Sequence, residues 1–570
     1  MKRLLVLLLA VCVTVAADDS RLSNDLKHRS GDDPVDVIIQ YKTSPGERHA
    51  DKIRQHRGRV KAELGLIRAL SASLPARELR QLSDDPDVAY ISADRKVAGS
   101  LNYATAAAGA GYAWNYGYEG AGIGVAVIDS GISPNSEFNA AGGRTSRIVY
   151  SQNFATDKAT TSDVYGHGVH VASIIAGNGS YSTCLSCFAS LKGMAPAAKL
   201  INLRVLDGRG QGQDSWVIAA IDTAIKLKTK YNIRVMNLSL GRPVYESYTL
   251  DPLCQAVERA WNAGIVVVTA AGNEGRNYSA GTDGYGTITA PGNDPYVITV
   301  GAMKTKETPS TSDDTIASYS SKGPTPIDHI AKPDLVAAGN RVVALIANNG
   351  YLVQNFTINR VPYTYYRSDL SGLSSYYYRQ SGTSMAAAVV SGAVADLLEA
   401  QPLLTPDQVK ARLMKTARKQ FPLYSSVFDA ASGQTYTSQY DVFTVGAGYL
   451  DLAAALMNTD LALLPAKSPT AYYDAATGEV HLLYDTGALW GSGSLWGSAA
   501  IWGSQSFVNA DAALWGSGAL WGSAALWGSG ALWGSSSTQG FSALWGSGAL
   551  WGSSTTSSTE NTTLLVTGED

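Results

Sequence analysis

Long apolar runs are scarce in this sequence. After the first 17 residues, no stretch stays apolar over the roughly 20 residues that a membrane-spanning helix needs. An excess of one charge is also lacking, because 45 Lys and Arg residues stand against 48 Asp and Glu, which gives a net charge of −3. Such a balance provides no electrostatic attraction to nucleic acid or to an anionic membrane surface. We therefore expect neither a nucleic-acid partner nor a transmembrane segment.

Cysteine is rare, with four residues in 570. Cys12 lies in the apolar N-terminal segment, which leaves Cys184, Cys187 and Cys254, and an odd number rules out a fully paired set of disulfides. The Cys184–Cys187 spacing can close a small disulfide loop or supply half of a metal site. A structural zinc ion needs four ligands, and no second Cys/His pair has suitable spacing, so a metal site is disfavoured. Cys254 is expected to be a half-buried thiol on a helix.

The first 17 residues have the pattern of a secretory signal peptide. Lys2 and Arg3 supply the positive charge, residues 4–15 form the apolar core, and residues 15–17 form a small-residue cleavage site. The apolar core is too short for a comfortable membrane span. We therefore expect residues 1–17 to be removed and the mature protein to be secreted, either free outside the cell or associated with its surface.

Residues 18–99 alternate between strand-like and helix-like stretches. Strands are expected at 37–41, 66–74 and 88–91, and helices at 50–64 and 76–82. This β-α-β-α-β order predicts a small α+β domain, which is marginal by itself because it is short.

From about residue 120 the chain alternates between apolar strands and helices. A continuous apolar run occurs at 124–128, similar runs recur at 200–205, 235–239, 265–269 and 297–300, and helix-like segments between them include 215–231 and 251–263. Strands covered on both faces have such runs, so the fold class is predicted to be α/β, with a doubly wound, mostly parallel sheet and helices on both faces. In such sheets, functional groups gather at the carboxyl ends of the strands.

Three polar residues at the ends of predicted elements form a candidate catalytic set. Asp129 follows the strand at 124–128, His167 comes 38 residues later at the start of a helix, and Ser384 begins another helix 217 residues further on. A serine nucleophile needs a base within hydrogen-bond reach, and the base needs an acid that fixes its tautomer. Taken singly, each residue has an ordinary explanation as a turn or cap residue. Together they predict nucleophilic acyl transfer.

Asn273 is a fourth candidate. It follows the apolar strand at 265–269, in the segment 270–275. From there its side-chain N–H can stabilise a developing oxyanion, together with the backbone N–H of Ser384 at the positive end of its helix. The alternative for this motif by itself is a turn asparagine among glycines.

Four blocks around these residues resemble the signature blocks of the subtilisin-like serine proteases. They read VIDSGI at 127–132, GHGVHVA at 166–172, AAGNEG at 270–275 and SGTSMA at 381–386, in the family's chain order. The resemblance implies a serine endopeptidase with its catalytic domain within residues 100–458. It implies that Asp129 orients His167, and that His167 takes the proton from Ser384 and passes it to the leaving amine. Asn273 and the Ser384 amide would bind the oxyanion.

The resemblance extends to the substrate site and to the preceding domain. It implies that an extended peptide substrate pairs as an added strand between two edges of the protein, formed by Gly210, Gly212, Ser239, Leu240 and Gly241. Residues 18–99 resemble the inhibitor-type propeptide of this family, which assists folding and blocks the active site until it is cut away. We therefore expect a zymogen that removes its own propeptide.

No cofactor is expected for catalysis. Calcium is common in the family, and this resemblance allows a structural calcium ion. The sequence has no carboxylate-rich loop with the spacing of a known calcium motif, and the loop at 178–191 has no acidic residue.

Several features depart from the family pattern, among them an extra stretch of chain and an arginine. Residues 348–378 form an extra stretch before Ser384, with seven tyrosines and little helical periodicity. We expect a surface insertion near the substrate cleft, with a buried extension as the alternative. Arg242 stands where the commonest family pattern has glycine, and it is expected to place a long cation near the substrate channel.

The end of the sequence is a repeat of tryptophan and glycine. After a predicted linker at 459–485, with a strand at 480–484, Trp-Gly pairs occur at Trp490, Trp496, Trp502, Trp515, Trp521, Trp527, Trp533, Trp545 and Trp551. Six of the eight intervals are six residues, which scatters the tryptophans around a helix but places them on one face of a strand. The tail at 486–570 is interpreted either as a module for surface attachment, polymer binding or self-association, or as a low-complexity segment without fixed structure.

Overall fold

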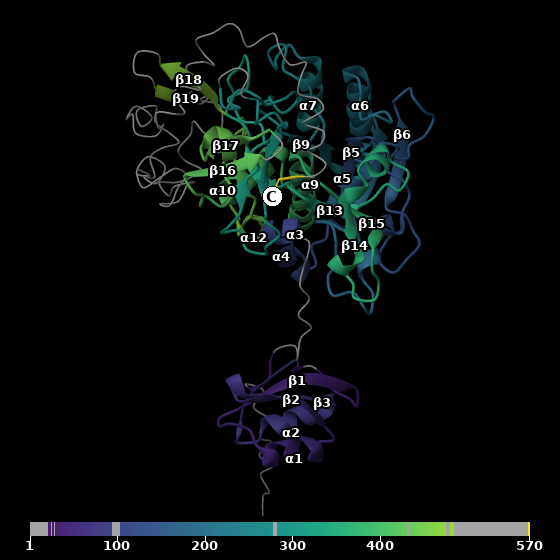
Figure 1. Cartoon of the computed structure of the whole chain (residues 1–570), viewed down its shortest axis with the longest axis vertical. Coiled ribbons are helices and arrows are strands. Elements are labelled where there is room, and N and C mark those ends of the chain that lie inside the picture. Colours follow the sequence, from purple (N-terminus) through teal and green to yellow (C-terminus); the bar gives the residue numbers. More distant parts are fainter. Residues whose placement is uncertain are drawn as a thin grey trace, which may run out of the picture. The chain divides into compact units, whose positions relative to one another are not determined.

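The computed structural model describes residues 21–23, 26–27, 29–93, 103–277, 282–429, 432–474, 479–483 and 568–569. The chain divides into two compact units, Met1–Ala98 and Gly99–Asp570 (Figure 1). The expected signal peptide at 1–17 and all Trp-Gly pairs of the expected tail lie outside the described residues.

The first unit is a four-stranded antiparallel sheet with two short helices. Its strands are β1 (Pro34–Tyr41), β2 (Arg59–Leu64), β3 (Ala69–Pro75) and β4 (Val88–Ala93), in the order β2-β3-β1-β4, and its helices are α1 (Glu47–Gln55) and α2 (Leu79–Ser83). Val37 and Ile39 of β1 and Ile53 of α1 are fully buried in its core. The unit is α+β, as the sequence predicts, but its order is β-α-β-β-α-β rather than the predicted β-α-β-α-β.

The helix predicted over 50–64 is wrong in its second half. α1 ends at Gln55, the backbone turns through Arg57 at a φ of 56°, and β2 follows. In β2, charged residues alternate with Val60 and Leu64, which are half-buried while their neighbours are exposed. That period of two is typical of a strand with one covered face, and it adds a second strand before β3.

The second unit is built on a mostly parallel sheet in the order β11-β10-β9-β8-β5-β7-β6, with β12 beside β10. Its strands are β5 (Gly124–Asp129), β6 (Ile148–Asn153), β7 (Lys199–Arg204), β8 (Ile233–Leu238), β9 (Val266–Ala270), β10 (Ile298–Lys304), β11 (Thr315–Ile316) and β12 (Leu335–Ala338). Among the strands that the structure describes in this sheet, only β11 pairs antiparallel with its neighbour. The predicted sheet is confirmed.

Helices pack against this sheet in two pairs. α5 (Gly168–Ala176) packs on α9 (Thr383–Ala400), and α6 (Asp214–Tyr231) packs on α7 (Pro252–Asn262). Every residue of β5, β9 and β10 is buried, which explains why most residues of these strands are apolar. Shorter helices complete the unit: α3 (Tyr103–Ala107), α4 (Ala110–Asn115), α10 (Pro406–Thr416), α11 (Val442–Val445) and α12 (Leu452–Met457).

α9 is the core helix of the second unit. Within the described residues it is the one helix long and apolar enough to cross a membrane, but 89% of its apolar window is buried inside the protein. It lies against β8, β9, β10 and β12.

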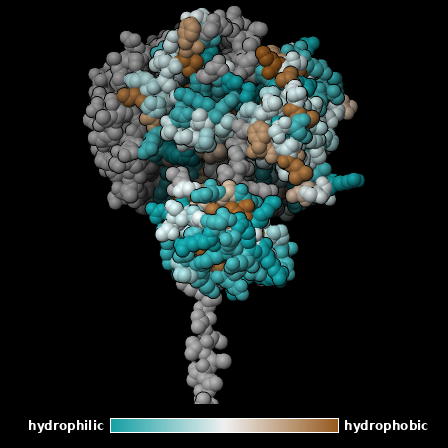
Figure 2. All heavy atoms as spheres, turned by 60° about the horizontal axis from the view of Figure 1, so that its bottom comes forward, coloured by the Kyte–Doolittle hydropathy of each residue, from teal (hydrophilic) through white to brown (hydrophobic). Residues whose placement is uncertain are grey.

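The face of the molecule in Figure 2 shows hydrophobic residues as separate patches among hydrophilic ones.

The stretch at 348–378 folds onto the second unit. It contributes α8 (Tyr351–Asn355), β14 (Arg360–Pro362) and most of β15 (Leu373–Gln380), which pairs with β13 (Val342–Leu345) in a small antiparallel sheet. Tyr366, Tyr377 and Tyr378 are fully buried, whereas Tyr351 is 44% exposed. The stretch is therefore a surface insertion that buries part of its aromatic side chains.

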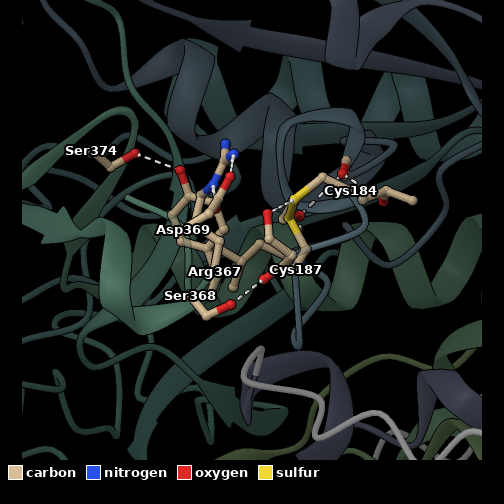
Figure 3. Close-up of a disulfide and its surroundings, with 12 residues drawn as sticks. Cys184, Cys187, Arg367, Ser368, Asp369 and Ser374 are labelled. Atoms are coloured by element: carbon tan, nitrogen blue, oxygen red, sulfur yellow. Dashed lines mark hydrogen bonds and ion pairs between the residues drawn. A yellow bond between two sulfur atoms is a disulfide. The ribbon is translucent and has the colours of Figure 1, made fainter. Parts of the chain in front are cut away.

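A disulfide joins Cys184 and Cys187 beside this insertion (Figure 3). The Ser368 amide donates a hydrogen bond to the carbonyl of Ser186 at 3.0 Å, so the disulfide loop and the insertion are connected through their backbones. Of the two alternatives for the Cys184–Cys187 pair, the disulfide is the one present. Cys254 is fully buried on α7, with its Sγ 3.3 Å from Asn293 Oδ1, so the expectation of a half-buried thiol is wrong.

Two hairpins follow α10. They are β16 (Tyr424–Asp429) with β17 (Gln434–Gln439), and β18 (Thr470–Asp474) with β19 (Glu479–Leu483). The segment predicted as a linker therefore carries a hairpin, and Thr470 forms a β-bridge with Ile330 of the second unit. The Ser468 side chain also reaches into this unit, where its Oγ lies 2.5 Å from Asp334 Oδ1.

Candidate active site

Asp129 and His167 meet at the carboxyl edge of the sheet. Asp129 is the last residue of β5, which lies between β7 and β8, and His167 precedes the first residue of α5. The Nδ1 atom of His167 lies 2.8 Å and 3.0 Å from the two carboxylate oxygens of Asp129. A carboxylate only accepts hydrogen bonds, so Nδ1 donates and Nε2 is left as the proton acceptor.

The electrostatics of this pair favour a protonated His167. The Asp129 side chain is 1% exposed and that of His167 is 15% exposed. Burial by itself lowers the pKa of His167, but the charge and hydrogen bond of Asp129 and the charge of Asp163 outweigh it, so the pKa of His167 is raised. The imidazole is thus tuned to take up a proton.

Asp163 and Ser130 hold the loop that carries His167, and the sequence analysis missed both. Asp163 is buried and accepts hydrogen bonds from the amides of Gly166 at 2.7 Å and Val169 at 2.8 Å. The hydroxyl of Ser130 lies 2.8 Å from Asp163 Oδ1 and accepts a hydrogen bond from the Gly168 amide at 2.9 Å. The signal in the sequence was an aspartate four residues before the histidine.

Gly168 must be glycine because the chain passes very close to Asp129 at this point. A Cβ atom at position 168 would lie 2.3 Å from the carbonyl oxygen of Gly131 and 3.2 Å from Asp129 Oδ1. No real side chain fits at the first of these distances. The glycine after His167 in the predicted block therefore allows α5 to begin directly against the end of β5.

Ser384 lies at the first turn of α9 and contacts Ser239. Its Oγ donates a hydrogen bond to the Ser239 carbonyl at 3.2 Å, and the Ser239 hydroxyl donates to the Ser384 carbonyl at 2.8 Å. Ser384 is 9% exposed. Within the described part of the chain, its hydroxyl makes this hydrogen bond rather than one to His167. Ser239 directly follows β8, so the structure brings this predicted substrate residue to the predicted nucleophile.

Asn273 is fixed by the residue that precedes Ser384. Its Oδ1 accepts hydrogen bonds from the Thr383 amide at 2.9 Å and the Thr383 hydroxyl at 3.1 Å. With the oxygen held in this way, the amide nitrogen is the end of the side chain that can donate to another group. Thr383 thus positions Asn273, a role that the sequence analysis did not assign.

The other predicted substrate residues lie on two segments. A Cβ atom at Gly210 would lie 2.6 Å from the ring of Tyr165, which is two residues before His167, so this segment packs against the histidine loop. Gly212 is exposed. Leu240 is half-buried and Gly241 is exposed, directly after Ser239.

Arg242 is bound in two ion pairs. Its guanidinium contacts Asp214 and Asp251, each at 2.9 Å, and so it connects the starts of α6 and α7. Burial lowers the pKa of Arg242, but the two carboxylates outweigh it and raise the pKa. The position of this cation near the substrate channel stays a prediction, and the two ion pairs show that its charge is bound to its neighbours.

The insertion reaches the histidine loop. The amides of Tyr351 and Leu352 donate hydrogen bonds to the carbonyls of Val164 at 3.1 Å and Tyr165 at 2.9 Å. The rings of Tyr165 and Tyr351 stack with centroids 6.1 Å apart. The predicted position of the insertion, near the cleft, agrees with these contacts.

His170, the second histidine of its block, is a core residue. Its Nε2 lies 3.1 Å from the carbonyls of Val342 and Tyr378, so it connects α5 to the sheet that contains the insertion. Burial lowers its pKa to about 3, which keeps the imidazole neutral. Its role is structural.

The described residues offer no side-chain cluster for a metal ion. Across these residues, no group of three or more His, Cys, Asp or Glu side chains is placed to hold one. The Cys184–Cys187 pair is oxidised to a disulfide. The structural calcium ion that the family resemblance allows stays a prediction.

Comparison with known proteins identifies the family of this chain. The subtilase family matches residues 120–448. Serine protease AprX of Bacillus subtilis (strain 168) is 34% identical over 396 residues, which cover 66% of this chain and 82% of that protein. Subtilisin E of the same strain is 32% identical over 371 residues, with 64% and 80% covered, and the alkaline protease of Shouchella clausii is 30% identical over 358 residues, with 62% and 75% covered. The chain therefore belongs to the subtilase family and is a serine endopeptidase.

Proposed function

We propose that the chain is a secreted zymogen whose second unit cleaves peptide bonds with Asp129, His167 and Ser384. The observation that carries the proposal is the contact of His167 Nδ1 with the buried carboxylate of Asp129. It leaves Nε2 as the nitrogen that can take a proton, at the sheet edge where Ser384 also lies. Proteins and peptides are the substrates that this chemistry serves.

The reaction begins when the Ser384 hydroxyl turns from the Ser239 carbonyl to His167 Nε2. His167 removes the proton while Ser384 Oγ bonds to the carbonyl carbon of the substrate, and Asp129 stabilises the imidazolium that forms. The proton then passes from Nε2 to the leaving amine, and the carbon–nitrogen bond breaks. A water molecule repeats the two steps on the acyl-enzyme and restores Ser384.

Asn273 is proposed to donate a hydrogen bond to the oxyanion of the tetrahedral intermediate. We expect Asn273→Leu to lower kcat by about 10²–10³-fold with little change in KM, because the donor acts mainly in the transition state. Steady-state kinetics on a peptide substrate measure both constants. Asn178→Leu is the matched control, since Asn178 hydrogen-bonds to the carbonyls of Ser136 and Asn139, away from Thr383. Equal kinetics for the two variants would refute the role of Asn273.

The first unit is proposed to be the propeptide that inhibits the second unit until it is removed. Its compact fold, separate from the second unit, supports this assignment. We expect secreted wild-type protein to begin near residue 100 and Ser384→Ala protein to begin at residue 18, because Ser384 cuts its own chain. Intact mass and N-terminal sequencing of both proteins measure this. Identical processing of the two would contradict self-cleavage and assign the cut to another protease.

A further inference from the structure

A buried carboxylate from the end of the sequence lies inside the second unit. The side chain of Glu569 is fully buried, and Figure 1 draws this end of the chain beside α9. The residues around Glu569 and Gly568 are named the anchor socket and are Arg276, Lys304, Ser318, Asn340 and Ser381. The residues between β19 and Gly568 include every Trp-Gly pair of the sequence.

The anchor socket neutralises the carboxylate of Glu569 and donates hydrogen bonds to it. Arg276 Nη2 lies 2.8 Å from Oε1, and Lys304 Nζ lies 3.2 Å from Oε2. The Ser318 amide donates to Oε1 at 3.1 Å, and the Ser318 hydroxyl donates to the same oxygen. Two cations and two neutral donors thus face one buried anion, which is the pairing that a buried charge requires.

The anchor socket also recognises the backbone of this segment. The side-chain amide of Asn340 donates to the Glu569 carbonyl at 2.8 Å and accepts from the Glu569 amide at 2.9 Å. Gly568 has a φ of 78°, and a Cβ atom there would lie 2.5 Å from Ser381 Oγ and 2.6 Å from Arg341 Cγ. Only glycine fits this conformation and this space. The contacts therefore select glycine followed by an acidic residue.

The anchor socket adjoins both loops of the catalytic centre. Arg276 comes three residues after Asn273, and Ser381 comes three residues before Ser384. Ser381 Oγ accepts a hydrogen bond from the Arg341 amide at 2.9 Å, and the next residue, Gly382, donates from its amide to the Gly339 carbonyl at 2.8 Å. A segment seated in the socket therefore touches the supports of the nucleophile loop.

We propose that Gly568-Glu569 is an anchor segment that binds the anchor socket of its own chain and so closes the Trp-Gly tail into a loop. One end of this loop is β19 and the other is Glu569. The ligand class of the socket is a peptide segment with glycine followed by a carboxylate side chain. The anchor lies outside the proposed catalytic groups, so its binding can be measured in a chain that has no activity.

The test measures thermal unfolding of full-length Ser384→Ala protein, in which self-digestion does not interfere. We expect Glu569→Gln to lower the unfolding midpoint by about 2 °C or more, because Arg276 and Lys304 lose the buried negative charge of Glu569. Glu560→Gln is the matched control, since it removes another carboxylate from the same tail. In a double-mutant cycle, Lys304→Met is expected to couple to Glu569→Gln and to add independently to Glu560→Gln.

A second pair of variants tests the fit of the backbone without a change of charge. Gly568→Ala is expected to lower the midpoint, whereas Gly552→Ala in the repeat is expected to leave it unchanged. Additive effects of Lys304→Met and Glu569→Gln, or equal midpoints for both glycine variants, would overturn the anchor. A midpoint shift that grows with protein concentration, together with a dimeric mass in analytical ultracentrifugation, would assign the segment to a second copy and overturn the closed loop.

Discussion

Replacing Ser384 with alanine is expected to lower kcat on an unfolded protein substrate by at least about 10⁵-fold. The reason is that Ser384 Oγ is the atom that bonds to the substrate carbon in the proposed mechanism, and alanine has no atom to replace it. Residual hydrolysis would come only from substrate binding and from the oxyanion donors. To keep the first unit from confounding the rate, both proteins would carry an engineered cleavage site near residue 99 and be cut by the same added protease.

Ser391→Ala is the matched control for this variant. Ser391 lies two turns further along α9, is fully buried, and donates a hydrogen bond to Asn237 Oδ1 at 2.9 Å. Losing that hydrogen bond should cost about 1 kcal/mol of stability and leave kcat close to the wild-type value. A Ser384→Ala protein as active as the Ser391→Ala protein would exclude Ser384 as the nucleophile.

The sequence predicts best those strands that are buried on both faces. β5, β9 and β10 are covered on both faces, so most of their residues are apolar and their positions follow from the pattern. β2 has one covered face and charged residues on the other, and it followed a true helix closely enough to be taken as its continuation. Short amphipathic segments of this kind are distinguished by their tertiary contacts, which the pattern does not contain.

The candidate site also contains residues that the sequence predicts and residues that it does not. Asp129, His167, Asn273 and Ser384 were predicted because reactive side chains stand at element ends in a recognisable order. Asp163 and Thr383 were not, since they act on backbone amides and on a side-chain oxygen that are close only in the folded chain. The anchor shows this most clearly, because Glu569 and Arg276 are far apart in sequence and in contact in the structure.

The charge of Asp129 is expected to set both the rate and its pH dependence. Asp129→Asn should lower kcat by about 10⁴-fold, because an amide can donate to Nδ1 and stabilise the wrong tautomer of His167, and because it cannot stabilise the imidazolium. His167 must be neutral to take the proton from Ser384, so activity rises with pH through the pKa of His167. In the wild type, Asp129 and Asp163 outweigh burial and hold that pKa above its ordinary value of about 6.5.

Asp129→Asn therefore has a second consequence, which a purely structural defect would not produce. It removes the charge and the hydrogen bond that raise the pKa of His167, while the burial that lowers it remains. The acid limb of the plot of kcat against pH should move to lower pH. The plateau value of kcat should fall at the same time. Asp157→Asn is the matched control, because Asp157 is an aspartate that pairs with Arg204 at 2.6 Å. A large loss of kcat in Asp129→Asn with an acid limb at the wild-type pH would show that Asp129 acts only as a support for the fold, because a carboxylate that faces the imidazole must shift its titration.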